Sequence, residues 1–269
     1  MLYGPKPGST SKGTSLLETS SVKVNVANQL ESDNVGELKL NYKFVTGDSR
    51  DYKQTGSQII VAGLSANKGG IDDQETGSYN TDLAIGVEDQ YPTGNAMIRN
   101  KMRRLEVRQQ GNLSVFPSEQ LPGALYQEIE PNGKVIYQNN NSTSFDQFAQ
   151  AGIPIAATLQ LPALPLSPVK VGDTWTTSDV SLEIPGTPES AQPKVSVNSK
   201  LVGIEWEGGY PTAHIHQTYD SSKSGGFKAK EVRFGTTTVL NPSIKLETDI
   251  FVAYRSGTLV KVSRSLVVS

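Results

Sequence analysis

The stretch Leu161-Pro-Ala-Leu-Pro-Leu-Ser-Pro-Val-Lys-Val-Gly-Asp-Thr-Trp175 gathers rigid, apolar and turn-forming residues in one place. Its three prolines fix φ and remove backbone donors, which excludes a helix or a central strand. We therefore expect an extended crossover that packs across two parts of the chain. The Gly-Asp pair predicts a turn, capped by Asp173, that carries Trp175 to a buried face.

On both sides of this stretch the sequence alternates apolar and polar residues with turn signals between, which predicts an all-β, mainly antiparallel fold. We expect two similar curved-sheet or half-barrel lobes: residues 1–160 with an N-terminal extended arm, and residues 176–269, joined by the crossover 161–175. Early strands are expected at 37–45 and 58–62, with a polar loop at 65–79. One short helix is expected at 144–151, where Ser144 begins a capping pattern.

Two patterns occur twice in the same order, which predicts an internal repeat of roughly 80–138 in 196–263. The first is strand, glycine, apolar residue, glutamate, then Tyr-Pro-Thr, at 83–93 and again at 201–212. The second is a hairpin closed by a glycine turn, at 125–137 and again at 250–262. Glycine supplies the positive φ that such turns need.

Composition excludes several classes of function. The 25 basic and 27 acidic residues nearly balance, so no overall field favours nucleic acid, and no cofactor motif is present. Cysteine is absent, which removes disulfides and thiol chemistry. No stretch is long and apolar enough for a membrane-spanning helix. Few charged residues and many small polar ones are typical of exported β proteins, so we expect a bacterial periplasmic, cell-surface or secreted location.

His214 and His216 are the strongest candidates for metal binding, because residues i and i+2 of a strand point to the same face. The third ligand would come from Glu205, Glu231, Glu247 or Asp249. The alternative is an ordinary polar outer face. A second acidic group, at 72–75, fits either a calcium loop or a solvated turn.

Five aromatic residues are candidates for contacts with a glycan or lipid-like ligand: Trp175, Trp206, Tyr210, Tyr126 and Tyr137. The alternative for each is packing in the core. No motif for a catalytic triad is present. Glu88 and Glu205 occupy matching positions of the repeat, which leaves carboxylate hydrolysis open, although turn roles fit them as well.

The motif Pro168-Val-Lys-Val-Gly-Asp-Thr-Trp175, together with the Gly-turn hairpin before it and the final hairpin, resembles uncharacterised exported bacterial β-rich proteins, often predicted lipoproteins. The resemblance spans most of the chain. It implies an exported protein and carries no catalytic residues. There is no cysteine near residue 1, so the resemblance implies a lipid anchor that is either trimmed or absent.

These observations predict a non-enzymatic exported or cell-surface protein with a structural, assembly or binding role. Self-assembly would use the N-terminal arm and the strand-like C-terminus, 259–269. Two alternatives stay open: a periplasmic carrier that holds a lipid-like ligand between the lobes, and a metal-assisted or carboxylate hydrolase.

Overall fold

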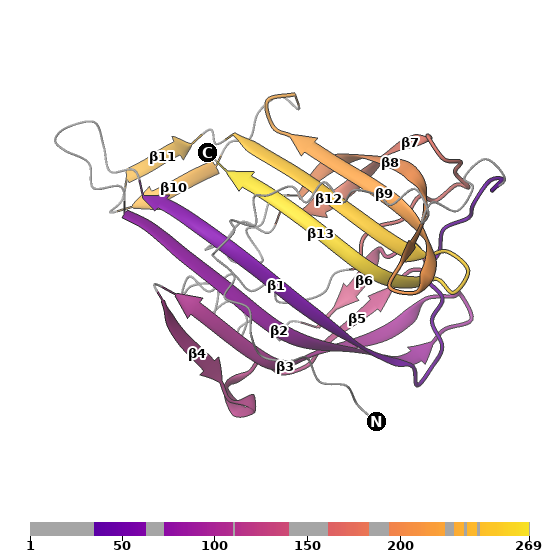
Figure 1. Cartoon of the computed structure of the whole chain (residues 1–269), viewed down its shortest axis with the longest axis horizontal. Helices are drawn as coiled ribbons and strands as arrows, with labels where there is room; N and C mark the ends of the chain where they lie inside the picture. Colours follow the sequence, from indigo (N-terminus) through magenta and orange to yellow (C-terminus); the bar gives the residue numbers. More distant parts are fainter. Residues whose placement is uncertain are drawn as a thin grey trace, which may run out of the picture.

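The computed structural model is all-β over the residues that it describes, which are 35–62, 73–109, 111–139, 161–182, 194–223, 229–233, 236–240 and 243–268. Two antiparallel sheets, of six and five strands, make up the body of the molecule, and neither closes into a barrel (Figure 1). No α-helix occurs within these ranges; a single 3₁₀ turn spans Ser118–Gln120.

The first sheet has the order β1-β2-β3-β5-β6, with β4 paired to β3. Its strands are β1 (Ser49–Ala62), β2 (Asp73–Gln90), β3 (Ala96–Gln109), β4 (Asn112–Phe116), β5 (Leu125–Ile129) and β6 (Val135–Gln138). The second sheet has the order β13-β12-β9-β8-β7. Its strands are β7 (Thr174–Ser181), β8 (Lys194–Glu207), β9 (Tyr210–Asp220), β12 (Ile244–Ala253) and β13 (Thr258–Val268).

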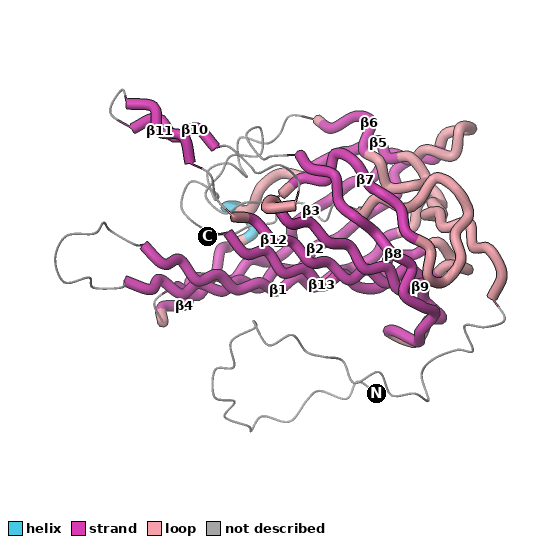
Figure 2. Tube along the Cα trace, turned by 90° about the horizontal axis from the view of Figure 1, so that it is seen from above, coloured by secondary structure: helices cyan, strands magenta, loops and turns pink. Residues whose placement is uncertain are grey.

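Both sheets follow the same chain path. Each is a meander of five strands in sequence order, with an insertion after its third strand: β4 in the first sheet, and the separate hairpin β10 (Ala229–Arg233) and β11 (Thr236–Leu240) in the second. The β10–β11 hairpin projects from one end of the molecule (Figure 2). The two expected glycine turns close the hairpins β5–β6 and β12–β13, with Gly133 at φ 89° and Gly257 at φ 64°.

The largest hydrophobic cluster takes residues from both sheets, including Ile98 and Ile129 of the first and Ile215 and Ile250 of the second, all fully buried. Two smaller clusters lie under one sheet each, around Leu105 in the first sheet and around residues 197, 244 and 246 in the second. The sheets therefore share one core at one end and have separate clusters towards the other.

The proline-rich segment 161–175 forms hydrogen bonds to both sheets. On the first sheet, the Leu164 N–H donates to the Asn132 carbonyl in the β5–β6 turn at 2.7 Å; on the second, the Gly172 N–H donates to Leu201 of β8 at 2.8 Å. Asp173 caps the turn by accepting a 2.8 Å hydrogen bond from the Lys170 N–H. Trp175 is only partly buried, with its ring packed against the shared core.

The expected strand at 37–45 is wrong as an element of a sheet, although its alternation is right. Leu40, Tyr42 and Phe44 are buried as the pattern requires, but only Leu38 forms a ladder contact, an isolated bridge to Val169. The backbone instead bonds to turns of both sheets, because Tyr42 N–H donates to Pro131 and Lys43 N–H to Gly257. The segment thus lies across the hairpin ends of the two sheets.

The expected polar loop at 65–79 is wrong over its second half, since β2 begins at Asp73 and pairs with β1 along residues 73–86. The long β1–β2 ladder supplies backbone partners that outweigh the weak strand propensity of this polar segment. The expected helix at 144–151 and the N-terminal arm lie outside the described residues. Over the described ranges, no helix has the length and apolar character to cross a membrane.

Candidate functional site

A histidine–carboxylate cluster lies on the outer face of the second sheet. Along β9, Ala213 and Ile215 are fully buried on the core side, so His214 and His216 point to the opposite face, as the alternation predicts. A β-bulge in β8 at Leu201–Gly203 shifts the register and brings the Glu205 side chain to the same face. In β12, Asp249 lies directly opposite His216.

Three short contacts join the four side chains in a row. The His214 Nδ1 atom lies 2.8 Å from Glu205 Oε1, and its Nε2 atom lies 2.9 Å from Asp249 Oδ1. The His216 Nδ1 atom lies 2.8 Å from the same Asp249 oxygen. Phe251 stacks on the His214 ring with centroids 4.4 Å apart, so this ring is held on three sides.

The four side chains of the cluster differ in their exposure to solvent. The Glu205 and His214 side chains are 13% and 16% exposed, whereas His216 and Asp249 are 37% and 40% exposed. Burial alone would raise the pKa of Asp249, but hydrogen bonds and charge from His214 and His216 outweigh it and hold this pKa below its ordinary value. Asp249 is therefore ionised at neutral pH.

The structure selects two of the four expected partners of the histidine pair. Glu205 and Asp249 contact the histidines, Glu247 lies two residues along β12 on the same face, and the side chain of Glu231 lies outside the described residues. Both histidines point at one carboxylate oxygen at hydrogen-bond distance. Within the described part of the chain, no group of three or more such side chains is arranged to hold a metal ion. The side chains of the acidic group at 72–75 are not among the described residues.

The tyrosines of the β5–β6 hairpin form a second candidate surface, on the outer face of the first sheet. Tyr126 and Tyr137 are 37% and 55% exposed. Tyr137 lies opposite Glu128, and the Tyr126 N–H bonds to Asn139, two residues beyond Tyr137. The tyrosines are therefore diagonal neighbours on one face, a relationship that separates side chains by about 7–8 Å.

Fixed polar groups border this tyrosine pair. Arg99 of β3 lies opposite Tyr126 and pairs with Glu88 of β2 at 2.5 Å. Glu128 accepts a 3.1 Å hydrogen bond from the Asn95 amide. The surface thus combines two exposed aromatic rings with an ion pair and a carboxylate.

The remaining predicted aromatic residues do not join a common site. Trp206 and Tyr210 are 48% and 49% exposed in the β8–β9 hairpin, in register with Pro211 and Glu207 respectively, so they lie on opposite faces of that hairpin. Trp175 packs against the core. Glu88 and Glu205 lie on different sheets with different partners, so they do not form the pair of carboxylates that hydrolysis of a glycoside requires.

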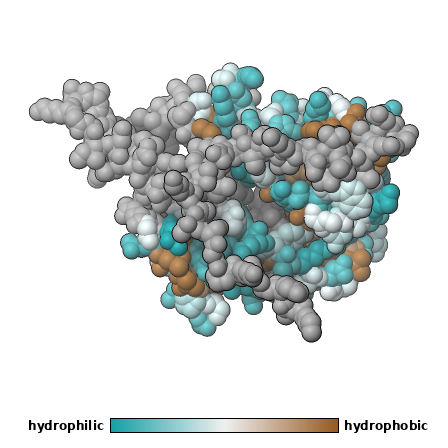
Figure 3. All heavy atoms as spheres, viewed as in Figure 1, coloured by the Kyte–Doolittle hydropathy of each residue, from teal (hydrophilic) through white to brown (hydrophobic). Residues whose placement is uncertain are grey.

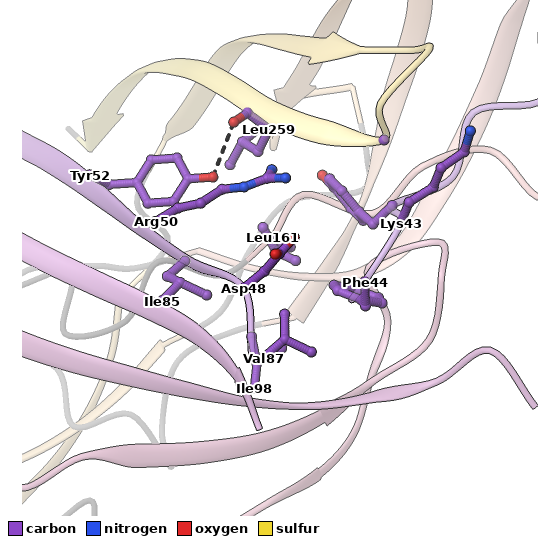
Figure 4. Close-up of a pocket in the computed structure, with 12 residues that line it drawn as sticks. Lys43, Phe44, Asp48, Arg50, Tyr52, Ile85, Val87, Ile98, Leu161 and Leu259 are labelled. Atoms are coloured by element: carbon purple, nitrogen blue, oxygen red, sulfur yellow. Dashed lines mark hydrogen bonds between the residues drawn. The ribbon is translucent and has the colours of Figure 1, made fainter. Parts of the chain in front are cut away.

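A small cavity of about 40 Å³ lies between the sheets, which sequence reasoning missed (Figure 4). Its lining is mostly apolar and includes Phe44, Ile98 and Leu161, together with the charged residues Lys43, Asp48 and Arg50. Tyr52 of β1 closes one side by donating a 3.1 Å hydrogen bond to the Leu259 carbonyl of β13. Nothing in the local pattern of either strand indicates this contact, because it depends on how two distant edges meet.

Residues 99–104 of β3 contain three arginines, and each of the three has an acidic partner. Arg99 pairs with Glu88, Arg103 with Asp51 at 2.9 Å, and Arg104 with Glu106. The charges of these three arginines are therefore neutralised locally.

Farther along this sheet, Leu113 and Val115 of β4 are more than half exposed, and the apolar patch in Figure 3 lies where Figure 1 places β4.

No protein-family model, curated protein or solved structure matches the chain. The resemblance to exported bacterial β-rich proteins accordingly stays a prediction.

Proposed function

We propose that this protein is a non-enzymatic, extracytoplasmic β protein with a binding role, and that it binds through the outer face of β5 and β6. The observation that carries the proposal is the pair Tyr126 and Tyr137, exposed side by side on one sheet face beside the Arg99–Glu88 ion pair. Two neighbouring aromatic side chains exposed on a rigid sheet are well placed to contact a ligand.

The chemistry of this surface favours a neutral saccharide chain. A sugar ring has an apolar face that stacks on an aromatic ring and hydroxyl groups that bond to fixed polar side chains, and tyrosine offers both kinds of contact. Arg99 is already neutralised by Glu88, and Glu128 is held by Asn95, so the surface presents oriented donors and acceptors with little net charge. A second pocket, of about 350 Å³, lies on the first sheet and is lined by Asp51, Tyr52, Lys53, Asp82, Arg103 and Arg104. Neither this pocket nor the cavity between the sheets includes the two tyrosines, which suits an extended polymer more than a small molecule.

The carrier alternative has less support. The cavity between the sheets has a volume of about 40 Å³, whereas pockets for small molecules measure roughly 300–1,000 Å³. The second pocket, of about 350 Å³, is large enough, but it is lined mostly by charged residues, which does not suit a lipid-like ligand. The hydrolase alternative is also less favoured, since His214 and His216 reach carboxylates but line neither described cavity.

Self-assembly is a second candidate function, supported by the edge strand β13. β13 (Thr258–Val268) pairs with β12 on one side, and no other strand of the described residues forms a ladder with it, although Tyr52 of β1 donates a hydrogen bond to its Leu259 carbonyl. Beyond this contact, such an edge accepts an added strand from another chain. Lys261 on this strand is the type of residue that limits uncontrolled pairing.

We also propose that the two sheets are related lobes that arose by duplication and are joined by the crossover at 161–175. The shared five-strand path and the matched hairpins β5–β6 and β12–β13 support this proposal. A duplication would account for one fold carrying two different outer faces, one with tyrosines and one with histidines.

Affinity electrophoresis tests the binding proposal. The full chain is run through native gels containing hydroxyethyl cellulose, dextran or galactomannan, and we expect at least one polymer to slow its migration. Replacing Tyr126 or Tyr137 with alanine should each remove most of the retardation, because stacking on aromatic rings is the main contact. Tyr210→Ala is the matched control, since Tyr210 is equally exposed on the other sheet.

Equal retardation of the wild type, Tyr137→Ala and Tyr210→Ala would show that the tyrosine face is not the site. Unchanged migration of the wild type with all three polymers would contradict the saccharide proposal. Native mass spectrometry tests self-assembly independently of saccharide binding. A protein that is monomeric at all concentrations would contradict self-assembly and would not affect the saccharide proposal.

A further inference from the structure

We propose that four side chains on the outer face of the second sheet form a proton-binding cluster: Glu205, His214, Asp249 and His216. In mildly acidic solution this cluster binds one additional proton, and its hydrogen bonds then link β8, β9 and β12. The inference concerns a different sheet from the saccharide proposal and does not depend on it. It rests on the three short contacts and on the number of hydrogens that they need.

The three contacts need three hydrogens, one for each pair of facing nitrogen and oxygen atoms. Two neutral imidazoles have one N–H each, and ionised carboxylates have none. With both histidines neutral, one contact therefore places a nitrogen lone pair against a carboxylate oxygen. One added proton turns all three contacts into hydrogen bonds, so the observed geometry fits the cluster with that proton bound.

His214 is the member that holds the added proton. Both of its ring nitrogens face carboxylate oxygens, at 2.8 and 2.9 Å, and only the imidazolium form has a hydrogen on each. Asp249 is an acceptor, since its lowered pKa keeps it ionised. Stacking on Phe251 and an exposure of only 16% leave the His214 ring little room to turn away.

The charged neighbours on each adjoining strand leave this assignment unchanged. On β8, Lys200 lies opposite His216, and Glu207 pairs with Lys261 of β13 at 3.4 Å. On β12, Glu247 shares the outer face with Asp249, and its charge favours a bound proton. Lys261 lies over the Phe251 ring, 5.3 Å from its centre. No side chain of the described residues supplies the missing hydrogen to the Glu205–His214–Asp249 row.

The proton-binding cluster loses its hydrogen bonds at both ends of the pH scale. At low pH, Asp249 itself becomes protonated, although hydrogen bonds and charge from the two histidines hold its pKa below the ordinary 3.8. When the added proton leaves His214 at higher pH, one of the three hydrogen bonds is lost and the cluster carries one more negative charge.

Nitrogen NMR of the histidine rings in the full-length wild-type protein tests the proposal directly. At pH 5.5 we expect both ring nitrogens of His214 to show the shifts of protonated, hydrogen-bonded atoms, and at pH 8 one of them to lose its hydrogen. In Glu205→Gln, the change should occur at a lower pH, because the carboxylate that faces the His214 Nδ1 atom is removed. Glu128→Gln on the other sheet is the control and should leave the transition in place.

A His214 ring that stays neutral at pH 5.5 would overturn the proposal, and so would an identical transition in the wild type and Glu205→Gln. If Glu205→Gln does not fold, the wild-type nitrogen shifts alone decide between the two outcomes. Loss of saccharide binding has no bearing on this result, because the tyrosine face lies on the other sheet.

Discussion

Tyr52 of β1 donates a hydrogen bond of 3.1 Å to the main-chain carbonyl of Leu259 in β13, so an edge strand of one sheet touches an edge strand of the other. β1 and β13 run side by side in Figure 1. Among the described residues, β1 pairs only with β2 and β13 only with β12. A side chain therefore links the two edges where no backbone ladder joins them.

Tyr52→Phe should lower the free energy of unfolding by about 1 kcal/mol, because it removes one partly buried hydrogen bond and leaves the Leu259 carbonyl without it. Urea denaturation followed by tryptophan fluorescence measures the change. Tyr210→Phe is the control, since this hydroxyl is on an exposed side chain and its loss should have little effect. Equal stability of the two variants would show that the edge contact contributes nothing.

Alkaline pH should weaken the junction of the sheets through Tyr42 and Tyr52. Burial raises the pKa of both hydroxyls above the ordinary 10.0, and most strongly for Tyr42, which donates a 2.9 Å hydrogen bond to the Pro162 carbonyl. Because the folded-state pKa is higher than the unfolded value, each hydroxyl contributes stability that is complete below pH ~10. This stability is lost as the pH rises from there through the higher folded-state pKa. The double variant Tyr42→Phe, Tyr52→Phe should therefore lose less stability between pH 9 and pH 11 than the wild type. A parallel loss would contradict the prediction.

Much of the strand content was predictable because it depends on local alternation. The two glycine-turn hairpins and the outward position of His214 and His216 follow from a period of two and from turn chemistry. Residues 40–44 show the limit of such reasoning. Their alternation predicted which side chains are buried, but their partners are turns at 131 and 257, which only the three-dimensional arrangement brings together.

The candidate sites were predictable to different degrees for the same reason. The histidine pair is local to one strand, whereas the choice of Glu205 and Asp249 from four carboxylates depended on strand register and on the bulge in β8. Tyr126 and Tyr137 were expected beside one hairpin. Their exposure on a single face became clear only from the pairing of β5 with β6.

Gly133 of the β5–β6 turn, which packs against the crossover, should tolerate substitution less well than Gly172 within the crossover. It has φ 89°, and a Cβ atom there would lie 2.7 Å from the Pro162 carbonyl oxygen and 2.9 Å from the Tyr42 ring. Gly133→Ala should cost about 1 kcal/mol or more for the backbone strain and about 1–3 kcal/mol for the overlap. Gly172→Ala is the matched control, with φ 97° but open space around its Cβ position.

Thermal or urea unfolding of the two glycine variants gives the comparison. The difference between them isolates the close packing of the crossover on the β5–β6 turn, since both share the strain of a positive φ. If Gly133→Ala and Gly172→Ala lose equal stability, the crossover does not pack as closely as the contacts indicate.

Asp249→Asn should remove part of the resistance of the protein to acid. The lowered pKa of Asp249 gives stability that is present above its unfolded value near 3.8 and is lost as the pH falls through the lower folded value. At pH 6 the variant should be less stable by about 1 kcal/mol or less, because the side chain is 40% exposed and solvent screens the interaction. The gap should narrow as the pH falls through the folded-state pKa, because the carboxyl group is then protonated in both folded and unfolded chains.

Asp51→Asn, which removes an exposed ion pair on the other sheet, is the control and should show a smaller gap at pH 6. A gap for Asp249→Asn that stays unchanged down to the lowest pH at which both proteins remain folded would mean that the side chain acts through packing and not through its charge.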